Sequence, residues 1–201
     1  MNRRGSIHLV LLAALGLVAV GAVLWGVGDY NDMVARNEEV SKSWSVVESQ
    51  YQRRMDLIPN LVETVKGTAG FEKSTLKAVV EARSRAGELT PTRETLDDPA
   101  SFRKFEDAQS HLSSALSRLL VVMERYPDIR SSQAYRELLA QLEGTENAIQ
   151  SARQDYNAAA QGYNTRIKMF PDKLVADYGR FKERPYFSAA PQSARAPEVK
   201  F

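Results

Sequence analysis

The chain has 201 residues, of which 26% are charged and 43% hydrophobic, and its 27 basic residues nearly balance 25 acidic ones. Phosphate binding needs a basic excess or a basic stripe, so we expect no nucleic-acid partner. The sequence contains no cysteine, which excludes disulfides, thiol catalysis and thiolate metal sites. Its size and composition fit one folded domain with an anchor.

Residues 9–27, LVLLAALGLVAVGAVLWGV, form an apolar run without a charge. At about 1.5 Å per residue, the run is long enough to cross a hydrocarbon core of about 30 Å. We therefore expect a short basic N-terminus over residues 1–8 and a single transmembrane anchor over residues 9–28. The alternative is a cleaved secretory signal, because a basic start precedes the run and small residues inside it offer a cut site.

The charges on the two sides of this apolar run differ. Arg3 and Arg4 precede it, whereas Asp29 and Asp32 follow it. The positive-inside rule then favours an N-terminus in the cytoplasm, with the bulk of the chain outside, on the periplasmic side of a bacterial-type cell membrane.

After the run, the apolar residues become periodic, which indicates one long helix leaving the membrane. The positions on three- and four-residue steps are Tyr30, Met33, Asn37, Val40, Trp44, Val47, Tyr51, Ile58, Leu61 and Val65. Pro59 lies inside this helix. A proline there removes one hydrogen bond and clashes with the preceding turn, at roughly 3 kcal/mol, so we expect packing or polar contacts that compensate.

Three further helices are expected along the chain. The first ends near Gly87, which can adopt a left-handed conformation. The second has Pro99 in its first turn and Asp97 or Asp98 as its cap. The last is the most regular and ends at Pro171. Its apolar residues recur every seven positions, at Tyr135, Leu142, Ile149, Tyr156, Tyr163 and Phe170.

The long helix that leaves the membrane, from Tyr30 to Val65, and the last helix, from Tyr135 to Phe170, have matching lengths of about 53 Å, which favours antiparallel pairing. We therefore expect an all-α fold, in which an N-terminal transmembrane helix is followed by an elongated antiparallel, coiled-coil-like four-helix bundle over residues 29–187.

This pairing brings charged residues of two helices to one level, if Tyr163 lies level with Tyr30. The charged residues concerned are Arg53, Arg54, Glu143 and Glu146. We expect an interhelical ion-pair layer there, with Asp56 and Arg153 pairing at its edge. The alternative is a set of solvated charges, each pair worth under about 1 kcal/mol.

Several segments in this order resemble the LemA family of membrane-anchored helical proteins. They are YN at residues 30–31, the region of Trp44, RRMDLIPNLVETVK at 53–66, LLVVMERYPDIR at 119–130, LEGTENAIQSARQDYNAAAQGYN at 142–164, and FPDKLVADYGRFKERPYF at 170–187. The resemblance implies a single-span membrane protein with an elongated helical domain, and it implies no reaction. Within the segment RRMDLIPNLVETVK, Pro59 and Asn60 are candidates for structural or interaction roles.

The residues for catalysis or metal binding are few. The histidines are His8 and His111, and neither a hydrolase triad nor a multi-histidine site can be assembled from two. Asp107 lies one helical turn before His111, which suggests a carboxylate-rich metal site. However, the two E-x-x-H pairs of di-iron bundles are missing. We therefore expect no catalytic residue, no metal and no cofactor.

Tyr-Asn pairs occur three times, and the last helix would bring two of them to the membrane-proximal end. These are Tyr156 with Asn157, and Tyr163 with Asn164. Asparagine at a helical seam fixes register, and buried tyrosines are usually core residues with satisfied hydroxyls. We favour this structural role over a ligand site.

Residues 171–187 mix aromatic and charged side chains. They lie either at the membrane interface or folded back against the bundle. Residues 188–201, SAAPQSARAPEVKF, have the composition of a disordered tail.

Together, these features favour a membrane-anchored, non-enzymatic helical scaffold. Its expected partners are membrane lipid and either further copies of itself, as a homo-oligomer, or another protein. The alternative is an accessory or sensor subunit that modulates a membrane-bound signalling protein or protease.

Overall fold

The computed structural model describes residues 3–67, 71–89 and 92–188, and within these ranges the regular secondary structure is entirely helical, as predicted. The elements in chain order are α1 (Arg3–Lys66), α2 (Lys73–Glu88), the 3-10 helix η1 (Arg93–Leu96), α3 (Pro99–Met123), α4 (Pro127–Ser131), α5 (Gln133–Lys168) and α6 (Asp172–Gly179). The expected disordered tail lies outside the described residues beyond Ser188, as do the first two residues of the basic N-terminus.

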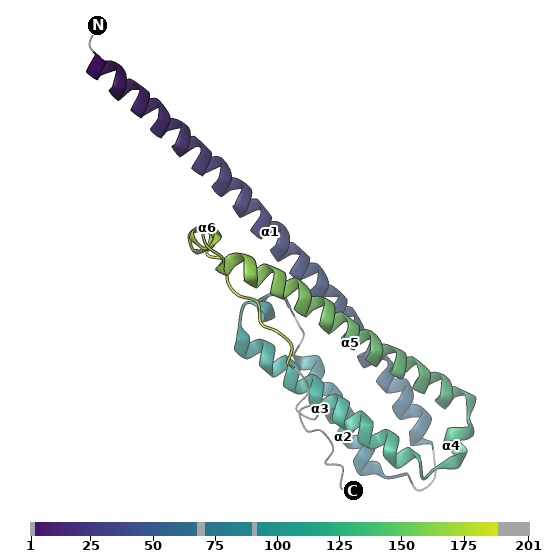
Figure 1. Cartoon of the computed structure of the whole chain (residues 1–201). Coiled ribbons are helices and arrows are strands. Elements are labelled where there is room, and N and C mark those ends of the chain that lie inside the picture. The colour runs from purple at the N-terminus through teal and green to yellow at the C-terminus, as the bar shows by residue number, and fades with distance from the viewer. Residues whose placement is uncertain (1–2, 68–70, 90–91, 189–201) are drawn as a thin grey trace, which may run out of the picture.

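Helix α1 is a single 64-residue helix that contains both the apolar run and the first bundle helix. Its apolar window is long and apolar enough to cross a membrane, and 0% of that window is buried. Leu17 is 75% exposed, whereas Trp44 further along the same helix is 1% exposed. The part of α1 over residues 11–28 therefore projects from the molecule as an exposed apolar helix, which Figure 1 shows in purple.

The remainder of α1 forms an up-and-down bundle with α2, α3 and α5, as the sequence predicted. Helix α5 packs along α1, and α2 packs against α3. We call the end of the bundle nearer the bare part of α1 proximal and the other end distal. Helix α2 has only 16 residues and covers the distal half alone.

The two halves of the bundle have different cores. In the proximal half, the Trp44 ring lies 5.6 Å from Phe102 and 5.3 Å from Tyr156, measured between ring centroids. In the distal half, aliphatic residues such as Ile58 and Leu119 are fully buried. Aromatic rings occupy more volume than aliphatic side chains, so the proximal half can be filled without α2.

The helix ends follow local rules with one exception. Asp98 caps α3 by accepting hydrogen bonds from the backbone N–H groups of Ala100 and Ser101, as predicted. Helix α2 ends at Glu88, near Gly87 as predicted, but Gly87 does not adopt the expected left-handed conformation. Gly87 instead permits a close approach, since a Cβ atom there would lie 3.2 Å from Cε of Met55.

The chain after α5 turns back along the bundle. Helix α6 is followed by an extended segment, residues 180–188, which lies along α5 on the side of α3 (Figure 1). Phe187 is buried in the proximal core, whereas Phe170, Leu174 and Tyr178 are exposed. The sequence left two positions open for residues 171–187, at the membrane interface or folded back against the bundle. The extended segment folds back against the bundle, whereas the outer face of α6 does not.

Candidate functional site

The proline inside α1 is compensated by a polar contact from α2. Pro59 has no N–H group to donate to the carbonyl oxygen of Met55, four residues earlier. That oxygen accepts a hydrogen bond from Nε of Arg83, at 3.0 Å. The carbonyl that the proline leaves free thus becomes the point at which α2 is tied to α1, which is the polar compensation that the sequence predicted.

Arg54 is a deeply buried charged residue, with 2% of its surface exposed. Its guanidinium group donates to Oγ of Ser113 at 2.8 Å, to Oε2 of Glu146 at 3.1 Å and to Oε1 of Gln109. It also lies 5.0 Å from the centre of the Tyr51 ring. A single side chain of α1 therefore links α3 and α5, and the expected contact between Arg54 and Glu146 is present.

The other charges expected in this layer are placed differently. Arg53 and Glu143 are exposed and form no ion pair within the described ranges, and Asn60 is exposed as well. The predicted pairing of Asp56 with Arg153 is wrong. Asp56 accepts a hydrogen bond from Gln52 on its own helix, at 2.8 Å.

Arg153 contacts α3 and the C-terminal segment instead of Asp56. It pairs with Glu106 at 3.1 Å and donates to the backbone oxygen of Ser188 at 3.0 Å. Its guanidinium carbon also lies 4.5 Å from the centre of the Phe187 ring. Arg153 is therefore bound to partners on α3 and in the C-terminal segment, whereas Asp56 is bonded within α1.

The repeated asparagines hold the extended segment by its backbone. The side-chain amide of Asn164 donates to the carbonyl of Arg184 at 2.8 Å and accepts from its N–H at 2.8 Å. Asn157 makes the same two contacts with Phe187, at 3.1 Å and 2.9 Å. The two asparagines are seven residues apart and so share one face of α5. We call this pair of contacts, together with segment 180–188, the clasp.

The tyrosines beside these asparagines are core residues. Tyr156 is fully buried, and its hydroxyl donates to the carbonyl of Pro185 at 2.8 Å. Burial raises the pKa of Tyr156 above its ordinary value, and burial also raises the pKa of Tyr163. Both phenols therefore stay neutral at physiological pH. Their geometry fits the structural role that the sequence favoured.

A cluster of charges lies where the bare part of α1 enters the bundle. Arg166, near the end of α5, forms ion pairs with Asp29, with Asp32 at 3.1 Å and with Asp172 of α6 at 2.7 Å. Asp29 is 4% exposed. A hydrogen bond from Arg36, supported by the charges of Arg36 and Arg166, lowers the pKa of Asp32. We call Arg166 and its three carboxylate partners the exit cluster.

The exit cluster ties α1, α5 and α6 together, and the sequence reasoning missed it. From the sequence alone, Asp29 and Asp32 indicate only the orientation of the membrane span. Their three-residue spacing on one helical face, just after an apolar run, was a usable sign that they share a partner.

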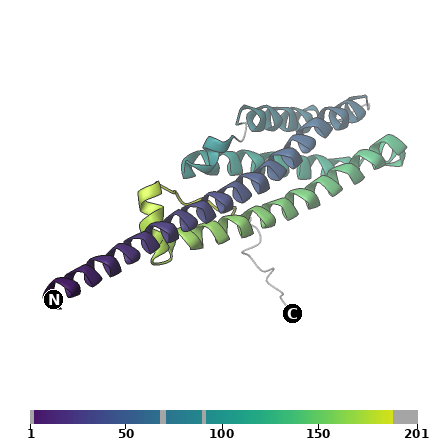
Figure 2. The ribbon, with the colours of Figure 1, turned by 90° about the horizontal axis from the view of Figure 1, so that it is seen from above.

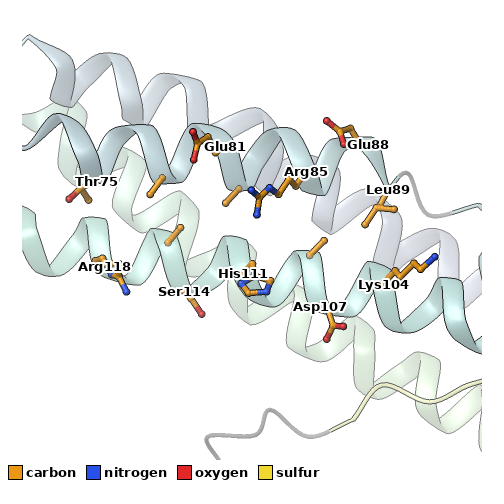
Figure 3. A pocket seen from close by; sticks show the side chains of 14 residues that line it. Thr75, Glu81, Arg85, Glu88, Leu89, Lys104, Asp107, His111, Ser114 and Arg118 are labelled. Carbon is orange, nitrogen blue, oxygen red and sulfur yellow. The ribbon is translucent and has the colours of Figure 1, made fainter.

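A groove of about 610 Å³ lies between α2 and α3 (Figure 3). Its walls are alanines with charged residues at the rim, among them Glu81, Arg85, Lys104 and Arg118. His111 and Asp107 also line it, one turn apart on α3. No group of three or more metal-ligating side chains is found in the part of the chain that the structure describes.

Comparison with known proteins agrees with the motifs. Residues 43–201 match the LemA family. Magnetosome protein MamQ 2 of Paramagnetospirillum magneticum is 31% identical over 205 aligned positions, which cover 94% of this chain and 75% of that protein. Magnetosome protein MamQ of Magnetospirillum gryphiswaldense is 28% identical over the same shares. Protein LemA of Metamycoplasma hominis is 23% identical over 75% of this chain and 64% of its own length. This chain belongs to the LemA family.

Proposed function

We propose that this protein is a membrane-anchored, non-enzymatic helical scaffold that assembles with copies of itself at the membrane. The apolar half of α1 crosses the bilayer, and the bundle extends from it on the periplasmic side. The biochemical role is mechanical: the bundle presents surfaces at a fixed position relative to the membrane.

The observation that carries this proposal is the continuity of α1. One helix passes from an exposed apolar run into a closely packed core, and Asp29 is already buried at the junction. The exit cluster holds α5 and α6 against α1 at the same level. A flexible linker between anchor and domain would let the domain tumble freely, whereas an unbroken helix fixes its direction.

The relatives supply a second line of support. Two of them are named as magnetosome proteins, and the aligned region covers nearly all of this chain. We extend to this protein only the idea of a membrane-associated protein.

The groove between α2 and α3 favours a second candidate function, an accessory or sensor subunit of a membrane-bound signalling protein or protease. Its alanine walls leave space for side chains of a partner, and its charged rim can select for them. In this version the bundle modulates another protein through the groove.

Chemical crosslinking in membranes, followed by mass spectrometry, tests the proposal. A link between two copies of one lysine can join only two chains, so Lys42 and Lys104 report directly on self-assembly. We expect such links for the scaffold. Links from the groove-rim Lys104 to one other protein, without any same-lysine link, would contradict self-assembly and support the accessory function. A variant with Lys104→Arg is the matched control, because it keeps the charge and removes the reactive amine.

A further inference from the structure

The corner between α5 and α6 exposes a row of large apolar side chains. Phe170 is 82% exposed, Leu174 61% and Tyr178 89%. These residues are four positions apart, and Leu174 and Tyr178 therefore lie on one face of α6. The opposite face of the same helix is buried against the bundle through Ala176 and Asp172. Helix α6 is thus packed on its inner face and apolar on its outer face.

This row lies at the level where α1 leaves its apolar run. Asp172 of α6 is tied through Arg166 to Asp29, the first residue after the expected span. The Tyr30 and Phe181 rings are 5.2 Å apart. Figure 2 shows α6 standing across the direction of α1 beside it. If α1 crosses a bilayer, α6 then lies along the surface of that bilayer.

A glycine at the end of α6 allows this close approach. A Cβ atom on Gly179 would lie 3.0 Å from Cε2 of Tyr30 and 2.6 Å from Cε2 of Phe181. A larger residue at position 179 would require the rings of Phe181 and Tyr30 to shift. The next residue, Arg180, has a left-handed conformation with φ of 55°, which turns the chain back into the clasp. Helix α6 is therefore held between the exit cluster and the clasp.

We infer that the outer face of α6 is a second membrane contact, in which Phe170, Leu174 and Tyr178 enter the interfacial layer of the bilayer that α1 crosses. The exposed apolar face of α6 lies at the level where the exposed apolar part of α1 ends. A bilayer that surrounds α1 would therefore reach this face, so we identify lipid as its binding partner. Exposed Lys173 and Lys182 flank the row, and cations beside aromatic and aliphatic side chains are typical of helices at the membrane surface. The inference rests on the proposed function, because it requires α1 to be inserted.

The contact would restrict the tilt of the bundle. A single helix can lean in the bilayer, whereas two contacts at an angle to each other define a plane. Copies of the protein would then meet with the same orientation.

The absence of cysteine makes a direct test possible. Full-length single-cysteine variants Tyr178→Cys, Leu17→Cys and Val121→Cys are labelled with an environment-sensitive fluorophore and reconstituted into phosphatidylcholine–phosphatidylglycerol vesicles. Each vesicle sample is prepared with and without lipids that carry a quencher on the acyl chain. Val121 is the control, because it is 64% exposed near the distal end of α3.

We expect strong quenching at positions 17 and 178, with at least a twofold difference from position 121. Quenching at 17 without quenching at 178 would overturn the inference while leaving the membrane anchor intact. A blue-shifted label at 178 that acyl-chain quenchers do not affect would mean contact with another copy, and would also overturn it. Absence of quenching at position 17 would overturn the proposed anchor itself, and the inference with it.

Discussion

Arg54 offers the most specific test of how the bundle is held together. Its side chain is 2% exposed. Among the described residues, it is the only side chain of α1 that hydrogen-bonds to Gln109, Ser113 and Glu146. Replacing Arg54 with Met keeps a long, unbranched side chain and removes the charge and every hydrogen bond. The neighbouring Arg53 is exposed, so Arg53→Met is a matched control on the same helix.

The cost of Arg54→Met can be worked out from its partners. Gln109 is 5% exposed and would keep an unpaired side-chain oxygen, at about 1–3 kcal/mol. The side chain of Glu146 is 46% exposed, so water replaces the arginine there and the loss is under about 1 kcal/mol. The sum is about 1–4 kcal/mol, which corresponds to a Tm lower by roughly 3–12 °C for a domain of this size. Arg53→Met should change stability by less than about 0.5 kcal/mol.

Circular dichroism at 222 nm, followed during thermal unfolding in detergent, measures both variants. Glu146→Ala, alone and combined with Arg54→Met, completes a double-mutant cycle. Equal Tm values for the Arg54 and Arg53 variants would refute the role of Arg54 as a buried link. Strictly additive losses in the cycle would remove the ion pair with Glu146 from the explanation.

Three other results are expected. Arg83→Met should cost about 1 kcal/mol in the natural chain and measurably less in a Pro59→Ala background, where the new N–H group satisfies the freed carbonyl; equal costs in chemical denaturation would contradict this account of the proline. Asn157→Ala should speed amide hydrogen exchange at residue 187 at least tenfold while the rest of α5 stays protected, and unchanged exchange would exclude the clasp. Burial raises the pKa of Tyr156 above its ordinary 10.0, so the folded chain keeps a proton that the unfolded chain loses. Stability is therefore complete below about pH 10 and falls as pH rises beyond it, and Tyr156→Phe should lessen that fall in thermal unfolding between pH 8 and 11.

Helices α1, α3 and α5 could be predicted because each carries a local rule, whereas the short helices η1, α4 and α6 were not predicted. Heptad spacing of the apolar residues gave α1 and α5, and an aspartate followed by proline gave the start of α3. The contact of Arg54 with Glu146 followed from pairing two helices of equal length. The partners of Arg54 on α3, Gln109 and Ser113, could not be predicted in this way, since the length of α1 and α5 says nothing about the rotation of a third helix.

The C-terminal region was harder for a different physical reason. Asn157 and Asn164 bind backbone groups of the extended segment. Every residue has these backbone groups, so the sequence does not indicate which residues the asparagines bind. The same region contains aromatic residues that fold back against the bundle and others that remain exposed. Neither a membrane-interface position nor a folded-back position therefore describes the whole region. The exit cluster joins Arg166 to residues more than 130 positions earlier, which only the fold brings together.

The most direct test of the central claim is the mass of the full-length protein in lipid nanodiscs and in detergent, measured by light scattering over a range of concentrations, with negative-stain imaging of the particles. One chain has a mass of 22.5 kDa. A membrane-anchored, self-assembling scaffold predicts discrete particles that contain several chains in lipid. A protein mass of one chain in lipid at every concentration would contradict self-assembly and leave a partner protein as the target of the bundle.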